Sequence, residues 1–258
     1  MFLDRDVAST CPDDMQLAEW KLRLELAAMY RIYDAKGFSE EIFNHITVRV
    51  PGDKTHFLIN PFGLNYAEVT ARNLVKIDLG GNPVSQTDYP VNRAGFVIHS
   101  AIHRARGDAH CVIHTHTTSG LAVACKEQGL TFDNFYASFI KGTVGYHDFE
   151  GVTVRTEEQT RLVENLGSNR CLILRNHGLL VVARDIYQGY YTMYMLQRAC
   201  DVQMTSQSMA GANIPLSDAA CAASVADGDQ TDPHGDLYQK VFSAAARRAQ
   251  ATLEALAK

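Results

Sequence analysis

The sequence predicts an α/β protein whose central sheet is mixed or antiparallel. Apolar residues recur at the spacing of helix faces in some stretches and alternate at the period of strands in others. Glycine-containing turns join neighbouring strand segments directly, which is typical of hairpins. The strict alternation of strand and helix that builds a doubly wound parallel sheet is absent. Since no convincing linker divides the 258 residues into two cores, we expect one domain over residues 1–258.

The first half of the chain opens with a helix and continues with strands. The helix is expected to open with Pro12-Asp13-Asp14, because proline and acidic residues suit a first turn, and to end at Gly37. Its apolar residues recur at helical spacing, namely Leu17, Trp20, Leu24, Ala27 and Ala28. Three strands are expected next: Ile46–Val50, Phe57–Ile59 after the turn at Pro51-Gly52-Asp53, and Leu74–Leu79.

Helices and strands are mixed in the second half. The first expected elements are a helix over Arg93–Arg106, a strand over His110–His114 and a short helix over Leu121–Ala124. A helix over Glu157–Leu166 follows, then strands over Cys171–Leu174 and Leu179–Val182, and a long helix over Tyr187–Gln207. Met209–Pro233 lacks periodicity and is rich in small and polar residues, so we expect a loose connection over about 209–233. A final amphipathic helix is expected over about 237–256.

Composition argues against several classes of function. With 24 basic and 29 acidic side chains the net charge is −5, and no basic cluster interleaves with aromatics, so nucleic-acid binding is not expected. No apolar run reaches the roughly 20 residues that cross a bilayer, so no membrane partner is expected. Met1–Asp6 lacks the pattern of a signal peptide, and the six cysteines form no CxxC pair. These features predict reduced thiols and a cytoplasmic location.

Three histidines form the most informative pattern. His114 and His116 are two apart at the end of an expected strand, so both side chains would point to one face and could grip one metal ion. Hydrogen bonding of both imidazoles to backbone is the structural alternative. His177 lies in a turn between two apolar strands, where loops commonly carry function. Three neutral imidazoles suit Zn²⁺, Fe²⁺ or Mn²⁺ and leave a position open for water or substrate.

A second histidine pair lies on an expected helix. His99 and His103 are four residues apart and therefore share one face. This spacing also occurs in metal sites, but the protease version needs a glutamate after the first histidine, where this chain has Ser100. We therefore interpret His99 and His103 as structural residues.

Several motifs together are similar to those of the class II aldolase/adducin family. The chain resembles it from about Ala18 to Gln207, in the family's order and spacing. The segments that carry the resemblance are Asn44-His45-Ile46-Thr47-Val48-Arg49, Ile59-Asn60-Pro61-Phe62-Gly63-Leu64, Asn92-Arg93-Ala94-Gly95-Phe96-Val97-Ile98-His99, Ala105-Arg106-Gly107-Asp108-Ala109, Val112-Ile113-His114-Thr115-His116 and Arg175-Asn176-His177-Gly178.

The resemblance implies a three-layer α/β/α fold with a central, mainly antiparallel sheet, and a homotetramer with sites near subunit interfaces. The family's sugar-phosphate aldolases bind one divalent metal per subunit through histidines that match His114, His116 and His177. Zinc is the expected metal, with iron, manganese or cobalt as alternatives. The ion acts there as a Lewis acid that stabilises an enolate-like intermediate.

The chain departs from the aldolase pattern at the catalytic base. Those aldolases carry a glutamate that transfers the proton, and the matching position here is Gly95, which cannot supply a carboxylate. The phosphate cradle also differs, because its matching places hold His45, Phe62, Arg93 and Ala94. An ordinary sugar-phosphate aldolase is therefore not expected.

Further site residues follow from the same resemblance. Tyr136 matches a tyrosine that reaches a neighbouring subunit's site as a proton donor, or it is a buried aromatic residue. His45 is the other candidate catalytic residue, with a turn histidine as the alternative. Asn44, Arg93 and Gly63 are candidate substrate-binding residues; Arg93 could anchor a carboxylate or phosphate, or could be a solvated helix-start arginine.

The resulting prediction is a divalent-metal-dependent lyase of the aldolase or decarboxylase type, acting on a small hydroxylated or carboxylated molecule. Decarboxylation suits Gly95, since loss of CO₂ yields the enolate without removal of a C–H proton. One alternative is a non-catalytic, adducin-like assembly protein, and another is a three-histidine iron oxygenase. We expect a small-molecule substrate in each enzymatic case.

Overall fold

The computed structural model describes residues 6–151, 156–230 and 236–258. A seven-stranded sheet forms its centre, in the order β3-β2-β1-β4-β7-β6-β5. The strands are β1 His45–Arg49, β2 Phe57–Ile59, β3 Val75–Ile77, β4 Cys111–Thr115, β5 Val144–His147, β6 Cys171–Leu174 and β7 Gly178–Ala183. All neighbours pair antiparallel except β5 and β6, which are parallel. The expected mixed, mainly antiparallel sheet is confirmed.

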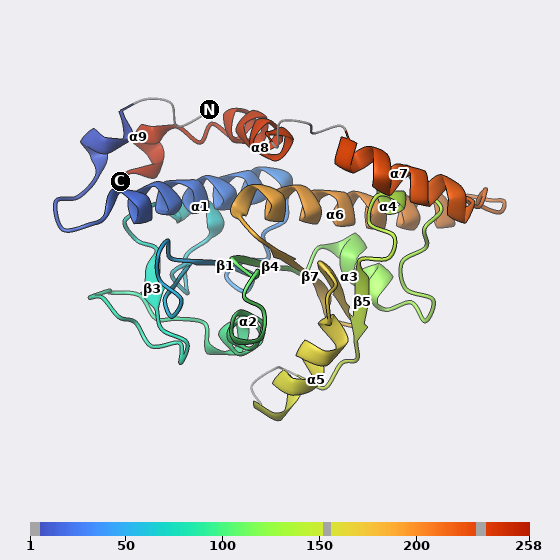
Figure 1. Ribbon diagram of the computed structural model, residues 1–258, viewed down its shortest axis with the longest axis horizontal. Coiled ribbons are helices and arrows are strands. Elements are labelled where there is room, and N and C mark those ends of the chain that lie inside the picture. Colours follow the sequence, from blue (N-terminus) through green and yellow to red (C-terminus); the bar gives the residue numbers. More distant parts are fainter. Residues whose placement is uncertain (1–5, 152–155, 231–235) are drawn as a thin grey trace.

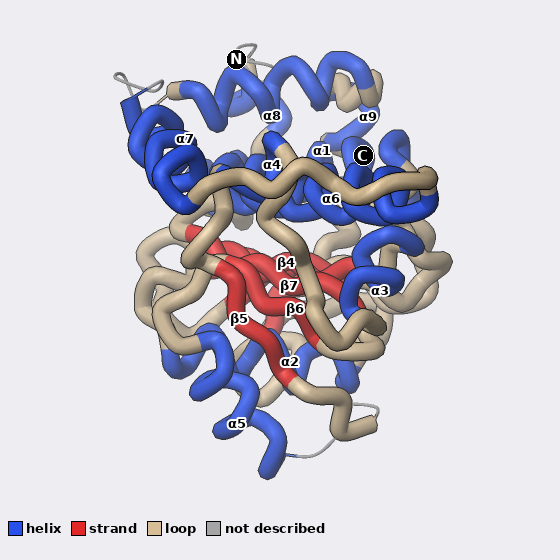
Figure 2. Tube along the Cα trace, turned by 90° about the vertical axis from the view of Figure 1, so that its right-hand side faces the viewer, coloured by secondary structure: helices blue, strands red, loops and turns tan. Residues whose placement is uncertain are grey.

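Helices cover both faces of the sheet. On one face lie α1 (Leu17–Lys36) and α6 (Ile186–Ser208), with an outer tier of α7 (Asp218–Gln230), α8 (Leu237–Arg248) and α9 (Leu253–Leu256) beyond them (Figure 1). On the other face lie α2 (Arg93–Ala105) and α5 (Thr156–Leu166). Short helices α3 (Thr118–Ala124) and α4 (Phe135–Ser138) and two 3₁₀ turns, Val7–Thr10 and Tyr66–Glu68, complete the described elements. Figure 2 shows the strands between the two helical layers.

The core follows from side-chain alternation along the central strands. In β4, Ile113 packs into the larger hydrophobic cluster with α1 and α6, while Val112 packs with α2 and α5. The same alternation separates Val181 from Val182 in β7. Residues on the α2 face of β1 and β4, including His45 and its cross-strand partner His114, therefore share one side of the sheet.

Two expectations near the C-terminus are wrong. The segment expected to be loose over 209–233 forms α7 over Asp218–Gln230, and its last residues, 231–233, lie outside the described residues. The helix expected over about 237–256 is two helices, because the chain leaves α8 at Ala249 and Gln250 has a φ of 53° before α9 begins. Strand β5 and helix α4 were not expected from the sequence.

No helix among the described residues combines the length and apolar character that spanning a bilayer requires. All six cysteines are free thiols.

Candidate metal centre

Three imidazoles meet where β4 ends beside the turn between β6 and β7. His114 is the fourth residue of β4, His116 follows the strand, and His177 occupies the turn. One ligand atom from each of the three lies within 4.8 Å of the others. Their ring centroids are separated by 4.5, 4.8 and 5.0 Å. The histidines that the sequence selected are therefore brought together in space.

The local backbone explains how His177 reaches the strand end. Thr115 of β4 pairs with Leu179 of β7, which places the tight turn beside the two strand histidines. Asn176 has a φ of 57°, and at Gly178 a Cβ atom would lie 2.4 Å from the carbonyl oxygen of Thr115. Only a residue without a side chain allows this close approach of β7 to β4. The glycine therefore helps to position the imidazole that precedes it.

The protonation states suit a divalent cation. The Nδ1–H of His114 donates a 2.9 Å hydrogen bond to the carbonyl oxygen of Leu179, which leaves Nε2 as the nitrogen with a free electron pair. Its Nε2 lies 2.7 Å from Nε2 of His116. Burial lowers the pKa of His177 to about 4 and the pKa values of His114 and His116 below their ordinary range. Neutral imidazoles are the form that ligates metal, so this donor set fits a divalent ion.

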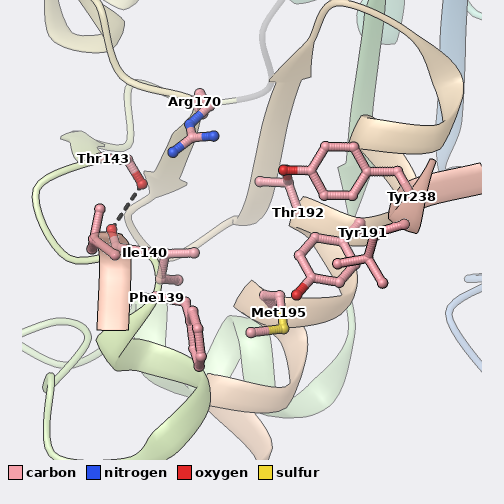
Figure 3. Close-up of a pocket in the computed structure, with 10 residues that line it drawn as sticks. Phe139, Ile140, Thr143, Arg170, Tyr191, Thr192, Met195 and Tyr238 are labelled. Carbon is pink, nitrogen blue, oxygen red and sulfur yellow. Dashed lines mark hydrogen bonds between the residues drawn. The ribbon is translucent and has the colours of Figure 1, made fainter. Parts of the chain in front are cut away.

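The three histidines line a pocket of about 690 Å³. This volume is within the usual range of small-molecule sites. Another hollow lies beside α6, α7 and α8, where Arg170, Tyr191 and Tyr238 line it (Figure 3). That hollow holds about 50 Å³, close to the space of one or two water molecules. A hollow beside Glu19 and Arg23 is larger, at about 820 Å³, so the chemistry of the three imidazoles, and not size, favours the histidine pocket as the functional one.

His45 lines the same pocket and fills space that Gly95 leaves open. A Cβ atom on residue 95 would lie 2.2 Å from Cε1 of His45. The His45 ring is 5.5 Å from that of His114, centroid to centroid. Its Nδ1–H donates to the carbonyl oxygen of Phe43 at 3.4 Å, and its buried Nε2 has no partner among the described residues. Burial lowers the pKa of His45 to about 4, so the ring is neutral near pH 7.

The candidate substrate-binding residues have different positions. Asn44 is buried and donates from Nδ2 to the carbonyl oxygen of Phe38, and Gly63 is exposed; neither belongs to the described lining of the pocket. Arg93 begins α2, but its side chain lies outside the described residues. Phe62, one of the positions expected to replace the phosphate cradle, does line the pocket.

Tyr136 lies away from the pocket of its own chain. It belongs to α4, where its ring packs 5.2 Å from the Arg198 guanidinium and 6.3 Å from the Tyr194 ring. These contacts agree with the partly buried aromatic alternative.

Sequence reasoning missed part of the pocket wall. Glu40 is the one carboxylate in its described lining, and its charge opposes the effect of burial on the pKa of His116. Phe43 and Phe149 line the pocket while about half exposed. No motif pointed to these residues, because they lie in irregular segments that only the fold brings to the histidines.

Comparison with known proteins identifies the class to which this fold and site belong. Residues 24–204 match the model of the Class II Aldolase and Adducin N-terminal domain, and the chain belongs to this family. It is 43% identical over 199 residues to a "Putative aldolase class 2 protein" of Caulobacter vibrioides, covering 77% of each chain. It is 46% identical over 193 residues to alpha-adducin of Rattus norvegicus, covering 74% of this chain and 26% of the adducin.

Solved structures agree with this assignment. An aldolase II superfamily protein from Pseudomonas syringae superposes with a TM-score of 0.89 at 36% identity, covering 95% of this chain and 98% of the other. An L-fuculose 1-phosphate aldolase from Glaciozyma antarctica PI12 superposes with a TM-score of 0.81 at 28% identity, covering 98% and 99%. The family resemblance expected from the motifs is therefore confirmed, together with the fold.

Proposed function

We propose that this protein is a divalent-metal-dependent lyase of the aldolase or decarboxylase type, acting on a small hydroxylated or carboxylated molecule. One observation carries the proposal: three neutral imidazoles, with Nε2 of His114 freed by its bond to Leu179, converge in a pocket of about 690 Å³. The name of the L-fuculose 1-phosphate aldolase, at 28% identity over nearly the whole chain, supports carbon–carbon cleavage as the reaction class.

The metal ligands in this proposal are His114, His116 and His177. A divalent ion held there supplies Lewis acidity for the negative charge that cleavage leaves on a carbonyl oxygen. Zinc is the ion we propose, one per subunit, because three neutral imidazoles are a common zinc donor set. The exposed rings of Phe43 and Phe149 lie at the pocket and would limit the access of water to it.

His45 takes the proton in this proposal. Retro-aldol cleavage removes a proton from a hydroxyl group, and His45 lines the pocket with a neutral ring whose buried Nε2 has no partner among the described residues. Decarboxylation needs no C–H base, so the absence of a carboxylate at Gly95 is compatible with either reaction. Tyr136 would act as proton donor in the site of a neighbouring copy. Asn44, Arg93 and Gly63 remain proposed substrate contacts.

We also propose an oligomeric state and a cellular compartment for this protein. A homotetramer would give Tyr136 access to a neighbouring pocket. The six free thiols support a reducing compartment, and we propose the cytoplasm.

A second candidate function is non-catalytic assembly. The 46% identity to alpha-adducin over 193 residues favours it, because this likeness is stronger than that to the fuculose phosphate aldolase. The three converging imidazoles, one buried and two partly buried, favour the enzyme, since imidazoles without a ligand gain nothing from such an arrangement. A three-histidine iron oxygenase is the further alternative, and the identity of the bound metal separates it from a zinc lyase.

Metal analysis combined with a substrate screen tests the proposal. Protein purified without chelator should contain about one divalent ion per chain. It should release an aldehyde or CO₂ from one member of a panel of small hydroxy acids, keto acids and sugar phosphates. His114→Ala should lose metal and activity together, while His110→Ala, an exposed histidine outside the pocket, should keep both. A wild-type protein that binds metal yet cleaves nothing, or binds none, would favour the adducin-like function.

A further inference from the structure

Beyond the three histidines, the surface that the pocket lining exposes is mostly apolar. Five large apolar side chains contribute to it from five separate segments of the chain: Phe43, Phe62, Ile98, Leu121 and Phe149. Such a lining, with a few polar groups at one place, is typical of sites that bind a small molecule by its apolar body and orient it by its polar end. The apolar part of the lining therefore carries information about the substrate.

Phe43 has an exposed ring on a backbone that is held in place. Its N–H donates to the carbonyl oxygen of Glu40 at 2.9 Å. Its own carbonyl oxygen accepts from Nδ2 of Asn92 and from Nδ1 of His45, each at 3.4 Å. The residue is nevertheless 53% exposed, although it is large and apolar. The backbone therefore holds this exposed ring at the pocket.

Phe149 brings a second exposed ring to the metal centre. It lies two residues after β5 ends at His147, and it is also 53% exposed. Its ring centroid is 6.1 Å from that of His177, in an edge-to-face arrangement at 72°. The apolar wall therefore continues directly into the set of metal ligands. A ligand that reached the ion with its oxygen atoms would have this ring beside it.

The polar side chains of the lining suit a sugar phosphate poorly. Asn92 is occupied at the start of α2, where Oδ1 accepts from the N–H of Gly95 at 3.4 Å and Nδ2 donates to Phe43. Burial keeps the pKa values of the lining imidazoles low, so Glu40 carries the one full charge of the described lining near pH 7. Its negative charge opposes a phosphate group held away from the ion.

We propose that the substrate of this pocket is an aromatic hydroxy acid or keto acid, whose oxygen atoms face the three histidines and whose ring lies against Phe43 and Phe149. The inference rests on the proposed function, because it names the substrate class of the same site. Carboxylate oxygen is a ligand that zinc accepts beside imidazole. An aromatic ring gains from phenylalanine both by the area it buries and by stacked or edge-to-face contact.

Two matched ligands test this substrate class. Mandelate and lactate are both α-hydroxy acids, and they differ in a phenyl group against a methyl group. Their affinities for the zinc-loaded wild type are measured by calorimetric titration, and mandelate should bind at least about tenfold more tightly. Equal affinities would overturn the inference and leave the proposed lyase standing.

Variants assign the preference to the two rings. Phe43→Ala and Phe149→Ala should each reduce the preference for mandelate over lactate about fivefold, with zinc affinity unchanged. Ile214→Ala removes an apolar side chain that is 85% exposed and outside the described lining, and it should leave the preference as in wild type. A preference unchanged in both pocket variants overturns the inference. Loss of a wild-type oligomer in those variants, seen by light scattering, would then assign the rings to a contact between copies.

Methyl signals locate the ligand ring without metal. In metal-free protein labelled with ¹³C at the methyl groups of isoleucine and leucine, mandelate should shift the signals of Ile98 and Leu121 through its ring current, and lactate should not. The signals are assigned by their loss in Ile98→Val and Leu121→Val. If wild type binds no zinc, the proposed function fails and this measurement decides the inference alone, because equal effects of the two ligands overturn it.

Discussion

The imidazole of His45 occupies the space that a side chain on residue 95 would need. A Cβ atom on Gly95 would lie 2.2 Å from Cε1 of His45 and 2.5 Å from each of its ring nitrogens. The two residues are 50 positions apart and come from β1 and α2. Position 95 therefore cannot hold a larger residue while the His45 ring stays in the pocket.

Gly95→Ala should expel the His45 ring from its place. In a helix, glycine to alanine otherwise gains about 0.5–1 kcal/mol, so a loss of stability would report the clash. We expect a net destabilisation of about 1–3 kcal/mol, measured by urea unfolding, with metal content unchanged. Gly107→Ala, where nothing lies within 4 Å of the added Cβ, is the matched control.

A double variant separates the steric fit of His45 and Gly95 from the role of His45 in the reaction. His45→Ala combined with Gly95→Ala should recover stability but not lyase activity. Equal stability of wild type and Gly95→Ala, with His45 still in place, would contradict the steric coupling.

Gly178→Ala should weaken the metal centre without touching a ligand. Its new Cβ would lie 2.4 Å from a backbone oxygen of Thr115, which cannot rotate away as a side chain could. The start of β7 must then move, and His177 with it. We expect metal affinity to fall about 10–100-fold, as for other changes that reorient ligands, measured by competition with a chelator. An affinity equal to that of wild type would show that the turn does not set the geometry of the site.

The stability of the metal-free protein should fall in mild acid. Burial lowers the pKa of His45 to about 4 and that of His103 to about 3, from 6.5. Between these values and 6.5 the unfolded chain binds more protons than the folded chain, so stability rises with pH and is lost as the pH falls from 6.5 toward 4.

Thermal unfolding of the metal-free protein measures this dependence. The Tm should be lower at pH 4.5 than at pH 7.5 by more than about 5 °C. His103→Gln removes one of the buried groups and should flatten the profile, whereas His110→Gln, an exposed position, should not. A Tm that stays constant across this range would show that protonation of these imidazoles does not control stability in mild acid.

Tyr136→Phe tests whether the site is shared between copies. If the hydroxyl group donates a proton in a neighbouring pocket, activity should fall about 100-fold while metal content stays at the wild-type level. Coexpression of Tyr136→Phe with His114→Ala should then restore part of the activity, because some pockets would combine an intact metal centre with an intact tyrosine. Two inactive variants that remain inactive together would assign Tyr136 to packing against Arg198 within its own chain.

Local patterns predicted most of the elements and pointed to the three histidines of the candidate metal centre. Alternate residues of an extended chain share a face, so the spacing of His114 in β4 and His116 directly after it predicts a common direction for the two side chains. The residue types of Asn176-His177-Gly178 likewise predict the turn between β6 and β7. Helix α7 was missed because its alanine-rich sequence favours a helix by intrinsic propensity and not by an apolar period. Strand β5 was missed because its buried positions hold Gly145 and His147, so no apolar alternation marks it in the sequence.

The family, the main elements and the three imidazoles follow from the sequence, since all depend on residues close together in the chain or on motifs in a fixed order. The tertiary structure alone decided that His45 fills the space beside Gly95 and that Thr47, His99 and His103 share one line of hydrogen bonds. These contacts join β1 to α2 across about 50 residues of chain. They arise from the close packing of α2 on the sheet, where a small change in distance makes or breaks a contact. The pattern of apolar residues along either segment contains no information about them.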